Sequence, residues 1–150
     1  MMIKKYNTFI NENIKDYLKP LSKDKIIDNL KHLSNSQKIE TAFENDISWL
    51  IEDMLLKGNL KPLDALYYSC EYGSEKSLNF LLKQKDVINE LDEKYIDRLV
   101  YKFYDKNPEC ILILIGDKNI TKHLSDEKLK IYWDLINGEM LYNKFYSTYR

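Results

Sequence analysis

The chain has 150 residues, which is enough for one domain with a substantial core but short for two domains. Its 23 lysine and arginine residues against 24 aspartate and glutamate residues leave a net charge of -1. This balance excludes the strong positive field that proteins use to bind nucleic acids or anionic membranes. No apolar run approaches the roughly 20 residues of a membrane-spanning helix.

The start of the chain differs from the remainder. Residues 1–20 are expected to form a removable N-terminal peptide, and residues 21–150 a single α-helical domain. The peptide lacks the apolar core of a secretory signal. Ser22 is a suitable N-cap for a helix that should cover the exposed end of the domain. The apolar face of this helix comprises Ile26, Ile27, Leu30 and Leu33.

Residues 62–85 predict a helical hairpin. Pro62 suits the first turn of a helix, Gly73 ends that helix with a positive φ, and Ser74 is a candidate N-cap for the second. Two short helices cannot bury their apolar faces alone, so the hairpin needs similar neighbours. Helical spacing predicts these faces as Leu63, Leu66, Ser69, Cys70, Leu78, Leu81 and Leu82.

Similar units occur on both sides of this hairpin. Residues 37–58 match it after a shift of 27 positions, and residues 95–116 after a shift of 33 positions. Asp46 and Lys106 then stand where Gly73 turns the chain. The alternative is an irregular all-α domain in which this spacing arises by chance.

Capping residues predict the elements of the C-terminal third. Asp92 should cap a helix after a connection at residues 89–92, and Asn107 with Pro108 should start another. A turn is expected at residues 116–119. Ser125 then opens a fourth, less regular pair of helices, divided at Gly138, whose second half closes the domain.

The central hairpin resembles an ankyrin repeat. It supplies Leu66, Ser69, Cys70, Gly73, Leu78, Leu81 and Leu82 to the pattern L-x-x-A-A-x-x-G-x-x-x-x-V-x-x-L-L. The T-P-L-H turn that is common in the family is absent, and Lys85-Asp86-Val87 stands in place of the family's G-A-D-V-N tail. The resemblance implies an all-α, ankyrin-like helical-hairpin solenoid of three to four degenerate repeats with an N-terminal capping helix.

The first dozen residues resemble the capsid-targeting peptides of T4-like bacteriophages, which a prohead protease cuts after I-x-E. The matching residues are Lys5, Tyr6, Phe9, Ile10 and Glu12. The next segment resembles a leader that precedes ankyrin-like repeats in viral and phage proteins, through Ile14, Asp16, Leu18, Pro20, Ser22 and Ile26. The resemblance implies a phage or viral protein, cut after Glu12, in the host cytoplasm or also in the virion head.

The sequence carries little catalytic signal. His32 and His123 lie far apart outside any metal-binding motif, and there is no Cys-x-x-Cys pair or phosphate-binding loop, so we expect no metal and no cofactor. Cys70 and Cys110 are expected to be reduced core residues, which fits a reducing compartment. A Cys/His nucleophile pair is the alternative. We expect that the protein is not an enzyme.

Ankyrin-like stacks bind partners with the exposed positions of the first helix of each pair. Carried over by the repeat offsets, these positions are Glu40, Glu44 and Asn45, then Tyr67, Glu71 and Tyr72, then Val100, Tyr104 and Asp105. The resulting face would be acidic and rich in tyrosine, a common residue at binding hot spots. The alternative is that these residues are only solvated.

The resemblance implies a non-enzymatic protein–protein interaction module. It would bind and inhibit or redirect a host protein, for instance a nucleic-acid-binding defence nuclease, without touching nucleic acid or membrane itself. One alternative is a packaged internal head protein of a phage without inhibitory activity. Another is a small hydrolase or nuclease inhibitor that acts on nucleotides, which would need a pocket with convergent polar groups.

Overall fold

The computed structural model describes the backbone of residues 22–149 and the side chains of residues 22–140. This part of the chain contains helices and no strand, which confirms the all-α prediction. The predicted removable peptide at residues 1–20 and the predicted cleavage after Glu12 lie outside the described residues. The helices are α2 (Lys23–Leu30), α3 (Asn35–Glu44), α4 (Ser48–Leu56), α5 (Pro62–Tyr72), α6 (Glu75–Leu81), α7 (Lys85–Glu90), α8 (Glu93–Phe103), α9 (Pro108–Gly116), α10 (Lys118–Thr121) and α11 (Asp126–Tyr149).

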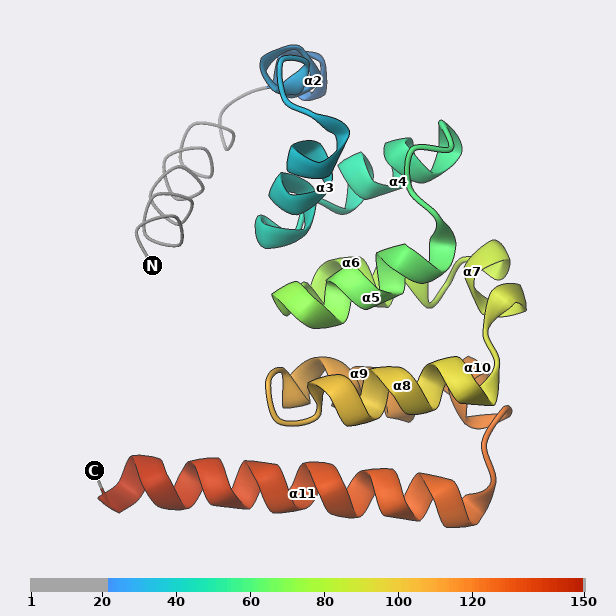
Figure 1. Cartoon of the computed structure of the whole chain (residues 1–150), viewed down its shortest axis with the longest axis vertical. Coiled ribbons are helices and arrows are strands. Elements are labelled where there is room, and N and C mark those ends of the chain that lie inside the picture. The colour runs from blue at the N-terminus through green and yellow to red at the C-terminus, as the bar shows by residue number, and fades with distance from the viewer. Residues whose placement is uncertain (1–21, 150) are drawn as a thin grey trace.

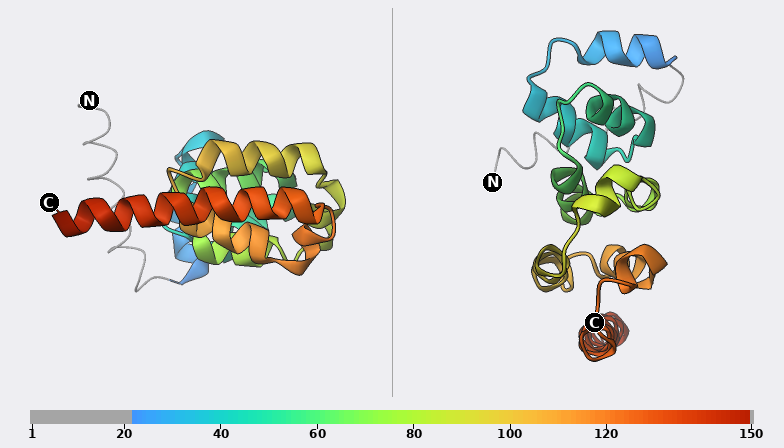
Figure 2. Two further views of the ribbon diagram at one scale, coloured as in Figure 1. Left: turned by 90° about the horizontal axis from the view of Figure 1, so that it is seen from below. Right: turned by 90° about the vertical axis from the view of Figure 1, so that its right-hand side faces the viewer.

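Six of these helices form three antiparallel pairs that lie in successive layers (Figure 1). The pairs are α3 with α4, α5 with α6, and α8 with α9. Viewed from the side, the first helices α3, α5 and α8 lie in one row and the second helices α4, α6 and α9 in another (Figure 2). Helix α2 lies across one end of the layers, and α11 packs on α9 at the other.

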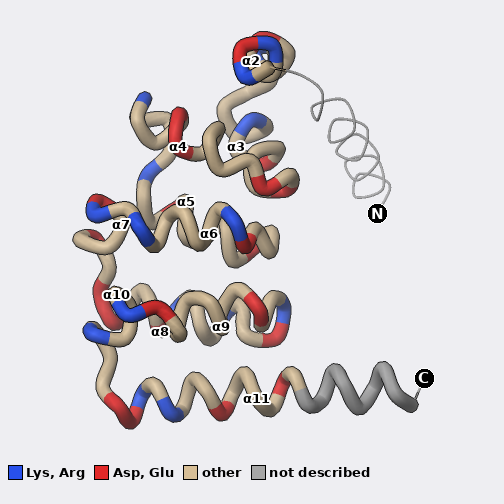
Figure 3. The backbone as a smooth tube through the Cα atoms, turned by 180° about the vertical axis from the view of Figure 1, so that it is seen from behind, with Lys and Arg blue, Asp and Glu red and all other residues tan. Residues whose placement is uncertain are grey.

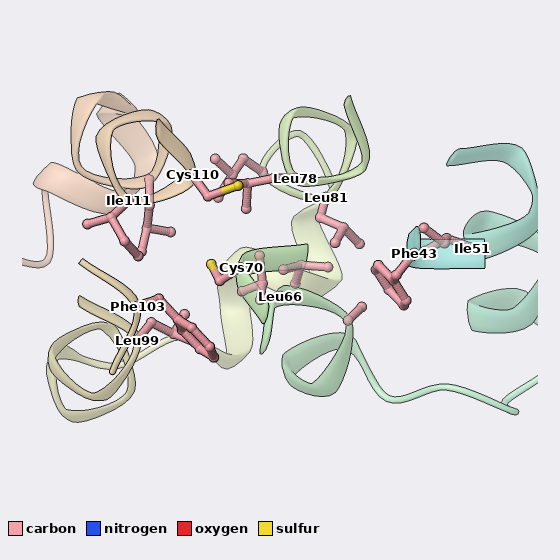
Figure 4. Close-up of a cluster of buried hydrophobic side chains, with 14 of the residues drawn as sticks. Phe43, Ile51, Leu66, Cys70, Leu78, Leu81, Leu99, Phe103, Cys110 and Ile111 are labelled. Atoms are coloured by element: carbon pink, nitrogen blue, oxygen red, sulfur yellow. The ribbon is translucent and has the colours of Figure 1, made fainter. Parts of the chain in front are cut away.

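The central hairpin folds as its sequence predicts. Pro62 is in the first turn of α5, and Gly73 ends that helix in the left-handed region, with a φ of 67°. Ser69 and Cys70 are completely buried, which lets neighbouring helices approach closely. Buried apolar side chains from all three pairs meet between the layers (Figure 4).

Asp46 rather than Ser74 caps the start of α6. Its carboxylate accepts bonds from the backbone N–H groups of Lys76, at 3.0 Å, and Ser77, at 2.8 Å, and from the Ser77 hydroxyl at 2.5 Å. Ser74 occupies the N-cap position, but its hydroxyl donates to the backbone carbonyl of Phe43 in the preceding layer. Ser74 is thus at the predicted N-cap position, but the side chain that caps the helix is that of Asp46, from the preceding layer.

Removing the Asp46 side chain should lower the free energy of unfolding by about 1–2 kcal/mol, because the first turn of α6 loses charge-assisted hydrogen bonds. Asp46→Gly is the suitable substitution, since Asp46 has a φ of 53° that glycine adopts without strain. Urea unfolding measures the change. Asp105→Gly, in an exposed turn, is the control, and equal stability losses in the two variants would contradict this role.

Asn107 also joins two layers. It begins α9 ahead of Pro108 as predicted, yet its side chain does not cap that helix. Its amide nitrogen Nδ2 donates to the backbone carbonyls of Cys70, at 2.6 Å, and Glu71, at 3.1 Å, at the C-terminal end of α5. These carbonyls have no partner within the helix, so the amide satisfies them from the next layer.

Both cysteines are buried free thiols, which confirms the prediction of core residues without a disulfide. The Cys110 Sγ atom lies 3.7 Å from the backbone oxygen of Ser69 in the preceding layer. Burial raises the pKa of the Cys70 thiol, and it raises that of Cys110 to about 12. Both groups therefore stay protonated, the opposite of what a catalytic thiol requires.

The N-terminal cap agrees with the prediction except at Ile27 and at Leu33, which lies beyond the end of α2. The Ser22 hydroxyl accepts from the backbone N–H of Lys25 at 3.4 Å and so caps α2. Ile26 and Leu30 are buried, but Ile27, predicted to share their face, is 38% exposed. It follows Ile26 directly and so points about 100° away around the helix.

Three predictions for the second half of the chain are wrong. Helix α11 runs unbroken from Asp126 to Tyr149 through Gly138, so the fourth pair is a single helix. An exposed glycine within a helix costs about 1 kcal/mol, too little to break a helix that packs on a neighbour. Asn89, placed in a connection, lies in α7, and the turn predicted at residues 116–119 contains the start of α10.

Helix α11 is joined to α8 by Asp97. The Asp97 carboxylate accepts from the Tyr132 hydroxyl at 2.5 Å and from the Lys128 ammonium at 3.1 Å. These bonds lower the pKa of Asp97, and the bond from Tyr132 has the largest effect.

Across the described residues, no helix has both the length and the apolar character needed to cross a membrane.

Candidate interaction surface

Carboxylates and tyrosines gather where the C-terminal end of α3 meets that of α5. Glu40 and Glu44 lie one turn apart on α3, and Figure 3 shows acidic residues at that end of the helix, at the edge of the molecule. Glu40, Tyr68 and Tyr72 line a shallow pocket of about 180 Å³ together with Ser36 and Ile39. We call Glu40, Glu44, Tyr68, Glu71 and Tyr72 the acidic tyrosine cluster.

The cluster carries crowded negative charge. Burial raises the pKa of Glu44 to about 7, helped by the charge of Glu40 and a hydrogen bond with it. Burial also raises the pKa of Tyr72 to about 12, with further contributions from Glu40, Glu71 and Glu44. No lysine or arginine of the described residues forms an ion pair with these carboxylates. Glu44 also ends α3, where the helix dipole disfavours an anion.

Glu44 should make the protein less stable as the pH rises towards neutrality. Its carboxyl has a pKa of about 7 in the folded chain against 4.5 in the unfolded one. The folded state therefore binds more protons between these values, and the free energy of unfolding falls as the pH rises through that window. Glu44→Gln should remove this component, as measured by urea unfolding at about pH 5 and about pH 8.

Glu90→Gln serves as the matched control, because Glu90 is an exposed carboxylate on α7, away from the cluster. It should leave the pH dependence of the wild-type protein unchanged. If Glu44→Gln showed the same pH dependence as this control, the raised pKa of Glu44 would be refuted.

Four of the predicted binding residues therefore lie together: Glu40, Glu44, Glu71 and Tyr72. Tyr68 was missed, because only Tyr67, Glu71 and Tyr72 of this helix were predicted to be exposed. Its position four residues before Tyr72 could have identified it, since residues at this spacing share a helix face. The rings of Tyr68 and Tyr72 have centroids 6.4 Å apart.

Tyr67 belongs to the packing between layers as much as to the surface. Its ring meets that of Phe103 edge-on, with centroids 5.1 Å apart, and the Lys102 ammonium lies 5.0 Å from its centroid. Asn45 is engaged locally, since its Nδ2 atom donates to the Thr41 carbonyl at 2.8 Å. Tyr67 and Asn45 therefore flank the acidic tyrosine cluster rather than joining its charged groups.

The predicted residues on the third pair lie one layer further along. Tyr104 is partly buried at the end of α8, and Asp105 is exposed in the turn that follows. Val100, predicted to be exposed, is completely buried, so this assignment is wrong. It lies four residues after Ile96 on the apolar stripe of α8, a pattern that predicts burial.

The described residues contain no group of three histidine, cysteine, aspartate or glutamate side chains arranged to hold a metal ion. His32 and His123 are both exposed and lie on different parts of the stack, in the segments that follow α2 and α10. Cys70 and Cys110 are buried, whereas both imidazoles are exposed. The acidic tyrosine cluster is thus the surface at which predicted functional residues converge.

Comparison of the chain with protein-family models and with curated proteins finds no match, and comparison with solved structures finds none either.

Proposed function

We propose that this chain is an ankyrin-like helical-repeat protein that binds a basic partner protein through the acidic tyrosine cluster and performs no catalysis. The observation that supports this best is the gathering of Glu40, Glu44 and Glu71 from two layers around Tyr72, which lines a shallow pocket together with Glu40. The proposal has two parts, the repeat architecture and the partner, and each rests on different contacts.

Equivalent contacts between successive layers support the repeat. Ser74 and Asn107 are 33 positions apart, and each follows the turn of its own pair. They donate to the carbonyls of Phe43 and Cys70, which are 27 positions apart and stand in the last turns of α3 and α5. These are the offsets at which the sequence repeats. Asp46 and Gly73, also 27 positions apart, both adopt a positive φ.

The charge of the cluster favours a basic partner. Glu44 is held partly protonated near neutral pH by burial and by Glu40, so a lysine or arginine placed between them would relieve repulsion. Complementary charge speeds association and selects among partners more than it adds affinity. Tyr68 and Tyr72 offer flanking contact area that loses little conformational entropy on binding.

The proposed partner is a host protein, for instance a nucleic-acid-binding enzyme such as a defence nuclease, whose basic channel the carboxylates would enter in place of phosphates. This choice is supported by the resemblance of the N-terminal residues to phage peptides, notably at Tyr6, Phe9 and Glu12. The same residues support the alternative of a packaged head protein. Recovery from purified virions of a chain trimmed after Glu12, with no host partner, would favour that alternative.

Affinity capture from host lysate with mass spectrometry tests the proposal. A double charge reversal, Glu40→Lys with Glu71→Lys, should reduce recovery of a basic partner at least about tenfold, which corresponds to 1.4 kcal/mol. Tyr72→Ala should also weaken capture. The control is Glu90→Lys on α7, which changes the net charge away from the cluster.

Thermal melting of each variant shows whether the fold is kept. Equal recovery of the same partner by the wild-type protein and the folded double variant would contradict the proposal. So would a partner whose capture does not weaken as salt is raised, because the binding is argued to be electrostatic.

A further inference from the structure

An apolar groove lies along α4 and α6, on the side of the first two layers away from the acidic tyrosine cluster. It consists of two adjoining pockets of about 220 and 130 Å³, which share Glu52 and Leu56 of α4 as walls. The first pocket lies against α2 and contains Ile27 and Trp49, and the second extends to Phe80 of α6. We call this surface the α4 groove.

The α4 groove exposes more apolar surface than a solvated helix requires. Leu56 is 80% exposed, the most of any large hydrophobic side chain among residues 22–140, and Ile27 is 38% exposed. Single exposed apolar residues are ordinary, but a groove in which several adjoin marks a surface that another element covers. The groove has the form that receives the apolar face of an amphipathic helix.

The chain itself enters beside this groove. Lys23, the first residue of α2, lines the first pocket, and its ammonium lies 5.5 Å from the centroid of the Trp49 ring. Figure 2 shows α2 lying across the layer formed by α3 and α4. The segment that precedes Ser22 is therefore tethered at the groove wall, where its effective concentration is high.

Residues 3–17 have the pattern that such a groove accepts. Ile3, Tyr6, Ile10, Ile14 and Tyr17 follow one another at intervals of three and four residues, the spacing of one helix face. A helix of this length would extend about 21 Å at 1.5 Å per residue. Packed helices lie 8–10 Å apart, so a helix of about 21 Å spans about two such spacings. That is the length of the path from α2 across α4 to α6.

The charges of the segment and of the groove are complementary. Residues 3–17 contain Lys4, Lys5 and Lys15 against Glu12 and Asp16. The groove walls carry Glu52, Asp53 and Asp86 against Lys23. A basic amphipathic segment would therefore meet an acidic rim around an apolar floor, and like charges would oppose an acidic occupant.

We propose that residues 3–17 of this chain dock in the α4 groove, with their apolar side chains covering Leu56 and Trp49. The docked segment covers the side of the stack away from the acidic tyrosine cluster. The interaction is intramolecular and independent of the proposed partner, so its test does not depend on finding one.

A spin label at position 8 tests the proposal on the full chain. Thr8→Cys places the label on the side of the segment away from its apolar residues, and the native Cys70 and Cys110 are 0% and 1% exposed, so the new thiol reacts selectively. Paramagnetic broadening of backbone amide signals reports which helices the label approaches. Docking should broaden the amides of α4 and α6 strongly and those of α8 little.

Two matched variants make the outcome decisive. Leu56→Asp, at an exposed position that leaves the core intact, should restore the α4 and α6 signals to at least half of their unlabelled intensity. Tyr101→Asp, at a residue 49% exposed on α8, should leave the broadening unchanged. Broadening confined to α3, α5 or α8, no broadening at all, or broadening that persists in Leu56→Asp would each overturn the proposal.

Discussion

Replacing Phe43 by alanine should lower the free energy of unfolding by about 3–5 kcal/mol, which is near the upper end of what a single substitution causes. Phe43 is completely buried, and its ring packs against that of Tyr68 with centroids 5.6 Å apart. The side chain fills the contact between the first and second layers, so alanine would leave a cavity that neither layer can close alone. Its backbone carbonyl would still accept from Ser74.

Urea unfolding followed by circular dichroism measures this loss. The matched control is Ile131→Ala on α11, which removes a large apolar side chain that is 43% exposed and should change the free energy of unfolding by less than about 1 kcal/mol. Similar losses in the two variants would show that the layers are not held together as the structure indicates.

Gly73→Ala should destabilise the protein by about 2 kcal/mol, through backbone strain and crowding together. Gly73 has a φ of 67°, which places alanine in the left-handed region. A Cβ atom there would stand 3.1 Å from Oδ1 of Asn107, the residue whose amide satisfies the end of α5. Moving Asn107 aside would weaken its bonds to Cys70 and Glu71.

Gly58→Ala separates the two causes. Gly58 has a φ of 74°, but a Cβ atom there would meet nothing within 4 Å, so only the strain of about 1 kcal/mol applies. Gly138→Ala should instead raise the free energy of unfolding by about 0.5–1 kcal/mol. Gly138 lies within α11, and a Cβ atom there would meet nothing within 4 Å. Equal losses at Gly73 and Gly58 would exclude a contribution from Asn107.

Local signals predicted most of the helices. Ser22, Asp92 and Pro62 stand at helix starts and Gly73 at a helix end, because each acts on its own turn through a cap, a fixed φ or a tolerated positive φ. The same reasoning failed where the partner lies in another layer. Ser74 is used between layers, and no short-range pattern reveals that its hydroxyl reaches Phe43.

The acidic tyrosine cluster, like the helices, was predictable only in part from the sequence. The repeat offset transferred the face of Tyr67 and Glu71 to Glu40 and Glu44, and the structure brings Glu40, Glu44 and Glu71 together, although each is only partly exposed. It failed at Val100, because α8 buries this position, whereas its counterpart Tyr67 on α5 is only partly buried. The raised pKa of Glu44 could not be predicted from the sequence, since it depends first on burial.

The order of the layers has a consequence for how the chain folds. The main helix contacts of the described residues join each pair only to the next, so native contacts are close in sequence. Proteins with such local topology fold fast, on the order of microseconds to milliseconds, because little loop-closure entropy is lost before contacts form. The chain can also assemble in the direction of its synthesis, with the pair α3–α4 docking on α5–α6 before the ribosome has released α11.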